Sequence, residues 1–210
     1  MTKKIGVLGS GMVGKALAKG LAGKGYEVRI ASRDGTKLDD VAAGVGKGSF
    51  VDVAAWADTV ILAVKGSVAI EAVAMVSVQI AGKVVIDTCN PIADAPPVDG
   101  IIQFFTGPND SLMERLQKAQ PAARFVKAWS CVGNALMIDP ALEGGPPSMF
   151  VCGNDEAAKK DVSAILERCG WAIEDLGKAA GARAIEPLCQ LWCAPGMLRN
   201  DWRHAYRVLR

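Results

Sequence analysis

The fold is decided by the stretch Val7-Leu8-Gly9-Ser10-Gly11-Met12-Val13-Gly14. Its glycines have the spacing G-x-G-x-x-G, directly after an apolar strand pattern at residues 4–8 and at the start of a helical pattern. In this context Gly9 permits the tight turn from strand to helix, Gly11 lets the backbone approach a pyrophosphate, and Gly14 lets the helix pack closely on the strand. The phosphates would lie on the helix N-terminus, where free N–H groups point outward. The stretch therefore predicts a dinucleotide site, against the alternative of a glycine-rich turn without a ligand.

The residues after the second predicted strand, residues 26–31, favour NADP over NAD. Sites that prefer NAD carry Asp or Glu about 20 residues past the glycines, to bind the ribose 2′-hydroxyl. Here Ser32 and Arg33 occupy that position, and a hydroxyl with a guanidinium suits a 2′-phosphate. Lys37 could add a further positive charge, whereas we expect Asp34 to cap the local turn with Gly35. The alternative for Arg33 is an exposed arginine without a partner.

Length and composition limit the other possibilities. The chain has 210 residues, of which 50% are apolar and 22% charged, and its formal net charge is +2. This length allows one domain, or one with a small appendage. The small net charge gives no support to a nucleic-acid or membrane partner. No signal peptide and no spanning apolar run of about 18 residues is visible, so we expect a cytoplasmic protein.

The six cysteines form no C-x-x-C pair and are expected to be free, mostly buried thiols. Cys189 and Cys193 are four residues apart and would share a helix face, but no second ligand pair follows them, so we predict no metal site. Cys89 has some interest because it lies near the expected nicotinamide position.

Strand and helix patterns alternate along the chain, which predicts an α/β fold with a Rossmann-like, doubly wound, mainly parallel sheet. Extra strands and a helical tail, which reaches Arg210 with interruptions at Pro187 and Pro195-Gly196, complete it. Residues 1–120 are expected to form the NADP-binding core and residues 121–210 a C-terminal extension. Further strands are expected at residues 60–64, 83–87, 124–128, 148–152 and 171–176, and helices at residues 67–80 (capped by Ser67), 111–120 and 156–169.

Ligands of such sheets lie beyond the carboxyl ends of the strands, at the switch point of the strand order. We therefore expect the nicotinamide near Thr88-Cys89-Asn90-Pro91, where Asn90 either orients the carboxamide or forms a plain Asn-Pro turn. The predicted cofactor-binding residues are Gly9, Ser10, Gly11, Met12, Val13, Gly14, Ser32, Arg33, Lys37, Ala63, Val64, Lys65, Asn90 and Pro91.

The general acid or base of alcohol and hydroxy-acid dehydrogenases is missing from the sequence. His204 is the one histidine, and neither Y-x-x-x-K nor a His–carboxylate pair is visible. We therefore assign no catalytic residue. A flavin or deazaflavin acceptor fits, because its ring accepts hydride itself and the protein supplies orientation.

Several segments together resemble the family of F420-dependent NADP oxidoreductases, which includes the reductase domain of STEAP-type metalloreductases. They are residues 5–14, Ala31-Ser32-Arg33, residues 84–91, Phe125-Val126-Lys127-Ala128 and residues 151–155. The resemblance implies bound NADP, a homodimer, and hydride transfer to F420 or a flavin (FAD or FMN) as a small-molecule acceptor. The chain departs from the family at Trp129-Ser130, where an aromatic residue followed by Asn is common.

Two other functions stay open. An NADPH-dependent reductase of a small carbonyl or imine would need a proton donor, for which the sequence offers His204, Lys65 or Lys127. A non-catalytic NADP-binding redox sensor would bind the cofactor without turnover. In the tail, Arg199, Arg203 and Arg207 recur every four residues and would share one helix face. That face is either solvated or holds an anionic tail of the acceptor.

Overall fold

Eight strands form one sheet in the computed structural model, which describes residues 2–36 and 38–210. In chain order they are β1 (Lys4–Leu8), β2 (Glu27–Ser32), β3 (Gly46–Ser49), β4 (Thr59–Leu62), β5 (Val84–Asp87), β6 (Arg124–Lys127), β7 (Ser148–Gly153) and β8 (Ala172–Asp175). In the sheet the order is β3-β2-β1-β4-β5-β6-β7-β8. The first six strands in this order, from β3 to β6, run parallel to one another, whereas β7 is antiparallel to β6 and parallel to β8. The expected mainly parallel, doubly wound sheet with extra C-terminal strands is confirmed.

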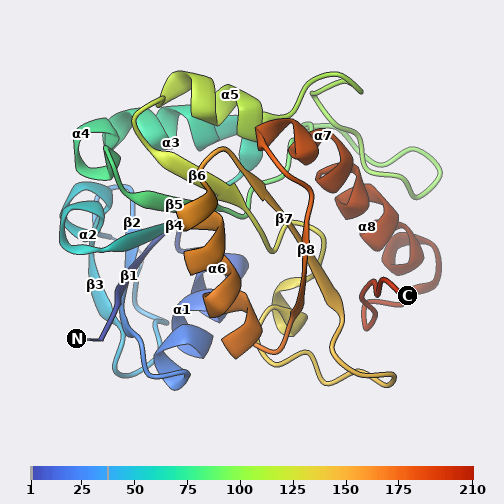
Figure 1. Ribbon diagram of the computed structural model, residues 1–210, viewed down its shortest axis with the longest axis horizontal. Coiled ribbons are helices and arrows are strands. Elements are labelled where there is room, and N and C mark those ends of the chain that lie inside the picture. Colours follow the sequence, from blue (N-terminus) through green and yellow to red (C-terminus); the bar gives the residue numbers. More distant parts are fainter. Residues whose placement is uncertain (1, 37) are drawn as a thin grey trace.

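Helices cover both faces of the sheet (Figure 1). On one face pack α1 (Met12–Gly23) and α6 (Glu156–Arg168); on the other pack α2 (Phe50–Trp56), α3 (Ala69–Met75), α4 (Ser77–Ile80), α5 (Leu112–Ala119) and α7 (Ala182–Ile185). Successive strand residues alternate between the two layers, so Val7 joins the core under α1 and Leu8 the core on the other face. Strands β4 and β5 are buried along their whole length, as their continuous apolar sequence predicts.

The region between β2 and β5 differs from the prediction in two places. Strand β3 was not anticipated, because the sequence Gly46-Lys47-Gly48-Ser49 has no strand propensity and pairs with β2 through its backbone. Helix α2, which follows it, was not anticipated either. The single helix expected at residues 67–80 is divided into a 3₁₀ turn, η1 (Gly66–Val68), and the helices α3 and α4. Ser67 lies inside η1 and therefore does not cap a helix.

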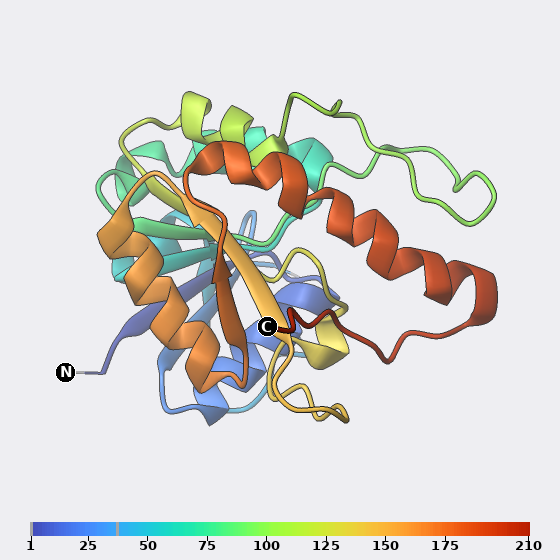
Figure 2. The same cartoon turned by 45° about the vertical axis from the view of Figure 1, so that its right-hand side comes forward.

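The tail is helical only as far as Arg199, so the prediction of helix to Arg210 is wrong. Helix α8 (Pro187–Arg199) accommodates Pro187 in its first turn and Pro195 in its interior, and it ends at Asn200, whose left-handed φ of 57° stops the helix. The last residues turn back toward the start of β7 (Figure 2), where the Ser148 N–H donates to the Tyr206 carbonyl at 2.8 Å.

The expected arginine stripe is therefore also wrong, because Arg203 and Arg207 lie beyond the helix that was to align them with Arg199. Arg203 donates to the Ala141 carbonyl at 3.2 Å. Arg210 forms a two-bond contact with Glu174 on β8. The tail arginines attach the last residues to the surface of the fold.

Two short 3₁₀ turns, η2 (Asn134–Leu136) and η3 (Ala179–Gly181), complete the described elements. Among the described residues, no helix combines the length and the apolar character that a membrane crossing requires. The division of the chain near residue 120 stays a prediction.

Candidate functional site

The three glycines of the β1–α1 loop have different reasons to be glycine. Gly9 has a φ of +129°, and a Cβ there would lie 2.1 Å from the Ala63 carbonyl oxygen. A Cβ on Gly14 would lie 1.9 Å from the Gly9 carbonyl oxygen. A Cβ on Gly11 would meet no described atom within 4 Å. The packing of the protein thus requires glycine at positions 9 and 14, whereas a side chain at position 11 would point into open space.

The N-terminus of α1 is left uncapped. Its N-cap is Gly11, no side chain accepts a hydrogen bond from the first turn, and the first turn carries no acidic residue. By contrast, Ser111 caps α5 and Asp155 caps α6 through side-chain oxygens. The free N–H groups and the positive end of the α1 dipole are therefore available to an anion.

The turn after β2 is closed by its own side chains. Asp34 accepts hydrogen bonds from the Thr36 N–H at 3.0 Å and from the Thr36 hydroxyl at 2.7 Å, as expected for a turn-capping aspartate. The Ser32 hydroxyl donates to the Thr36 carbonyl, so its proton is used within the turn. Arg33 is exposed and forms no ion pair with any described residue. Positive charge at this turn therefore comes from Arg33; Lys37 lies outside the described residues.

A cavity of about 470 Å³ joins the glycine loop to this turn. Of the predicted cofactor residues it is lined by Gly9, Ser10, Gly11, Ser32, Arg33, Ala63, Val64 and Lys65. Met12, Val13, Gly14, Asn90 and Pro91 do not line it: the first three lie in the opening turn of α1, and the last two follow β5.

The remaining lining residues are Asp34, which the sequence assigned to the turn and not to the cofactor, and six that the sequence did not single out: Thr36, Phe50, Val68, Glu71, Ala72 and Met75. Val68, Ala72 and Met75 have the spacing of one helical face after β4, which is the signal that could have found them. Together with Phe50 they give this end of the cavity an apolar wall, of a kind that suits a flat aromatic base.

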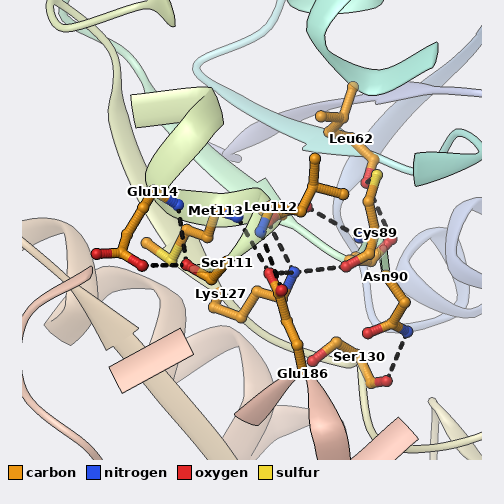
Figure 3. Close-up of polar contacts among 12 residues, drawn as sticks. Leu62, Cys89, Asn90, Ser111, Leu112, Met113, Glu114, Lys127, Ser130 and Glu186 are labelled. Carbon is orange, nitrogen blue, oxygen red and sulfur yellow. Dashed lines mark hydrogen bonds and ion pairs between the residues drawn. The ribbon is translucent and has the colours of Figure 1, made fainter. Parts of the chain in front are cut away.

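A buried polar network lies at the carboxyl end of β5 (Figure 3). Lys127, fully buried on β6, donates to the Asp87 carboxylate at 2.9 Å, to the Glu186 carboxylate at 3.0 Å and to the Cys89 carbonyl. Glu186 in turn accepts the Leu112 and Met113 N–H groups at 2.9 and 3.0 Å, which caps the N-terminus of α5. Sequence reasoning missed the role of Asp87 and Glu186 here.

Asn90 sits next to this network. Its amide nitrogen donates to the Ser130 carbonyl at 2.7 Å. Its amide oxygen and the Ser130 hydroxyl are both buried with no hydrogen-bond partner among the described residues. Trp129, directly before Ser130, is fully buried with a left-handed φ of 56°, a conformation that costs backbone energy in a non-glycine residue.

The titratable groups of the network favour fixed protonation states. Burial acts to lower the pKa of Lys127, but the Asp87 and Glu186 carboxylates outweigh burial and raise it, so Lys127 is charged at neutral pH. Burial, reinforced by Asp87, raises the pKa of the Cys89 thiol well above its ordinary value. Cys89 is therefore a neutral thiol and no nucleophile at neutral pH.

The three candidate proton donors differ in their access to a ligand. Lys127 is fully buried, whereas Lys65 lines the cavity, is half exposed and pairs with Asp94. His204 is stacked on Trp192 and its Nε2 lies 3.1 Å from the Trp192 carbonyl, which fixes that nitrogen as the N–H donor. Of the three, only Lys65 lines the cavity.

No group of three or more His, Cys, Asp or Glu side chains within the described part of the chain is arranged to hold a metal ion. Cys189 and Cys193 both lie on α8, one turn apart, and both are free thiols.

Comparison with known proteins agrees with this geometry. A sequence profile of the family described as NADP oxidoreductase, coenzyme F420-dependent, matches residues 4–91. A crystal structure from Arthrobacter sp. FB24, assigned as an F420-dependent NADP-reductase, is 33% identical with a TM-score of 0.91, and the match covers 99% of this chain and 100% of that one. The hypothetical protein SMa0349 of Sinorhizobium meliloti is 25% identical with a TM-score of 0.71, covering 100% of this chain and 96% of that one.

Metalloreductase STEAP3 of Rattus norvegicus is 28% identical over 199 residues, which is 93% of this chain. The chain spans only 39% of the length of that relative.

The fold and the glycine loop define an NADP-dependent oxidoreductase with a Rossmann-like core. Within that class, the chain belongs to the family of F420-dependent NADP oxidoreductases.

Proposed function

We propose that this protein transfers a hydride between NADPH and coenzyme F420 or a flavin-type acceptor. The observation that carries the assignment of a dinucleotide is the open side of Gly11 at the uncapped N-terminus of α1, since no described protein atom requires a glycine there. When bound, NADPH supplies the hydride from its nicotinamide ring.

The cavity residues and Asn90 would each contact a different part of the cofactor. The first-turn N–H groups of α1 would hold the pyrophosphate, and the exposed guanidinium of Arg33 would hold the 2′-phosphate. The apolar wall of Phe50, Val68 and Met75 would receive the adenine. Asn90, beyond the end of β5, would orient the carboxamide.

The acceptor assignment rests on two supports. The Arthrobacter structure is assigned as that of an F420-dependent NADP-reductase, and the match covers 99% of this chain and 100% of that one. In addition, Lys127 is fully buried and His204 has its Nε2 hydrogen-bonded to a backbone carbonyl. Of the three candidate proton donors this leaves Lys65, which is paired with Asp94, for a carbonyl or imine substrate. A ring that accepts hydride directly needs orientation rather than a proton donor.

We also keep the homodimer as part of this proposal. Helix α8 exposes apolar side chains, with Leu191 57% and Leu198 59% exposed, and Trp202 lies just beyond its end at 40%. A helix with an apolar outer side suits a second copy of the chain. Light scattering coupled to gel filtration would test it, and a monomer at micromolar concentration would refute it.

The first test is anaerobic NADPH oxidation, followed at the nicotinamide absorbance, with F420, FMN, FAD and ferric chelates offered in turn. Rapid turnover with F420 or a flavin supports the proposal. Tight NADPH binding without turnover would favour the redox sensor. Turnover only with carbonyl or imine compounds would move the assignment to that class, and there Lys65→Met would identify the proton donor.

A further inference from the structure

The turn after β5 is held at Cys89 through both of its backbone polar groups. The Cys89 N–H donates to the Asp87 carboxylate at 2.9 Å, and the Cys89 carbonyl accepts from the Lys127 ammonium. Asp87, Cys89 and Lys127 are all at most 3% exposed. Bulk water therefore does not compete for these hydrogen bonds, and the orientation of the turn follows that of Lys127.

Lys127 itself is placed by the carboxylates of Asp87 and Glu186. Asp87 ends β5, Glu186 directly precedes α8, and Glu186 is fixed in turn by the N–H groups that open α5. A buried ion pair of this kind is weak evidence for stability, because desolvation of the charges offsets much of their attraction. Its clearer effect is geometric, since a charge in such a setting has few alternative positions.

The residue that this arrangement orients is Asn90. The backbone carbonyl of Asn90 packs closely on Gly66, because a Cβ on Gly66 would lie 2.0 Å from the carbonyl oxygen of Asn90. The side-chain nitrogen of Asn90 donates to the Ser130 carbonyl, and the buried amide oxygen has no donor among the described residues. An unpaired buried acceptor is costly, and an N–H donor from a ligand would remove that cost.

We propose that Lys127, held between Asp87 and Glu186, is a positioning residue that fixes the Cys89–Asn90 turn so that the Asn90 amide oxygen accepts from the carboxamide of the nicotinamide. This inference rests on the proposed function, because it takes NADP as the ligand. Glu186, which directly precedes α8, would then help to position Asn90 at the nicotinamide end of the cofactor site.

The test compares two ligands that share one end. Adenosine 2′,5′-bisphosphate carries the adenine, the ribose, the 2′-phosphate and the 5′-phosphate but no nicotinamide, so it reports the Arg33 end and the α1 N-terminus without the Asn90 end. For Lys127→Met we expect its affinity, measured by calorimetry, to stay within twofold of the wild type. We expect NADPH to bind at least fivefold more weakly, and the fluorescence of its bound nicotinamide to move toward that of the free cofactor.

A matched control is available in Lys159, the second buried lysine, which is 4% exposed and pairs with Asp175 and Glu156. Lys159→Met removes a similar ion pair on α6 and is expected to leave both ligands unaffected. If Lys127→Met does not fold, Glu186→Gln keeps the size of the side chain, removes its charge, and is expected to show the same split between the ligands.

Equal weakening of both ligands, in a folded Lys127→Met or Glu186→Gln protein, would overturn the inference, because the network would then serve general stability. Unchanged NADPH affinity and fluorescence in such a variant would also overturn it. Failure of the wild type to bind either ligand would instead refute the proposed function itself.

Discussion

Replacing single glycines of the β1–α1 loop separates a requirement of the fold from a requirement of the ligand. In Gly14→Ala the new Cβ would lie 1.9 Å from the Gly9 carbonyl oxygen, where ordinary contacts begin at 3.4 Å. Helix α1 and the loop must move apart, which we expect to cost about 3 kcal/mol. For a chain of this length such a loss corresponds to a fall in Tm of about 6–12 °C.

Gly11→Ala should behave in the opposite way. The backbone of Gly11, with φ of −75° and ψ of −176°, is accessible to alanine, and its Cβ would meet no described atom within 4 Å. The gain from a stiffer unfolded chain and the loss of a preferred N-cap residue roughly cancel, so we expect the unfolding free energy to stay within about 1 kcal/mol of the wild type. The same Cβ would stand where the pyrophosphate approaches, and we expect NADPH to bind at least about tenfold more weakly, or about 1.4 kcal/mol.

Thermal unfolding monitored by circular dichroism, with and without NADPH, measures both quantities on both variants. Wild-type NADPH affinity in Gly11→Ala would refute the placement of the pyrophosphate. Wild-type stability in Gly14→Ala would refute the close packing of α1 on the loop.

Three shorter predictions concern other parts of the chain. Arg33→Ala should weaken NADPH binding about 10–100-fold, the value of a charge-assisted contact, and leave NADH binding unchanged. Arg199→Ala, which also removes an exposed arginine, is the control, and equal losses of affinity for NADPH and NADH in a titration would contradict the prediction. Hydrogen bonds from Arg183 lower the pKa of Glu114 below its ordinary 4.5, so this pair stabilises the fold above that pH and less as the pH falls through the lowered pKa. In urea unfolding, the loss of unfolding free energy in Arg183→Ala should therefore be smaller at pH 3 than at pH 7. An equal loss at both pH values would contradict the prediction. The neighbouring Cys189 thiol lowers the pKa of the half-buried Cys193 thiol, so a disulfide reagent at pH 8 should label Cys193 before the buried cysteines. A fast phase of thiol labelling that persists in Cys193→Ser would contradict this prediction.

The sheet was largely predictable because its strands are apolar segments that follow one another with helical patterns between them. Prediction was poorer where tertiary contacts decide the structure. Strand β3 has the sequence Gly-Lys-Gly-Ser and exists because the edge of β2 offers it backbone partners. The tail after Asn200 contains residues that are compatible with a helix, but its hydrogen bonds to Ser148 keep it extended.

The candidate site divides in the same way. The glycine loop and Arg33 could be found because their spacing from the strands is local. The partners of Lys127 could not, since Glu186 lies 59 residues further along the chain. A weak signal was present: a lysine that ends a buried strand such as Arg124–Lys127 needs a buried counter-charge.

The reversal of β7 relative to β6 has a consequence for how this enzyme can diversify. Every residue that lines the cavity lies between positions 9 and 75, whereas the turn at Asn90 is braced by Lys127 and Glu186 from the second half of the chain. Lys127 lies on β6, directly before the reversal, and Glu186 follows the two strands that come after it, so the two ends of the cofactor site are encoded in separate stretches of the gene. Recombination or drift downstream of residue 120 could therefore change the electron acceptor while the choice of nucleotide is inherited unaltered.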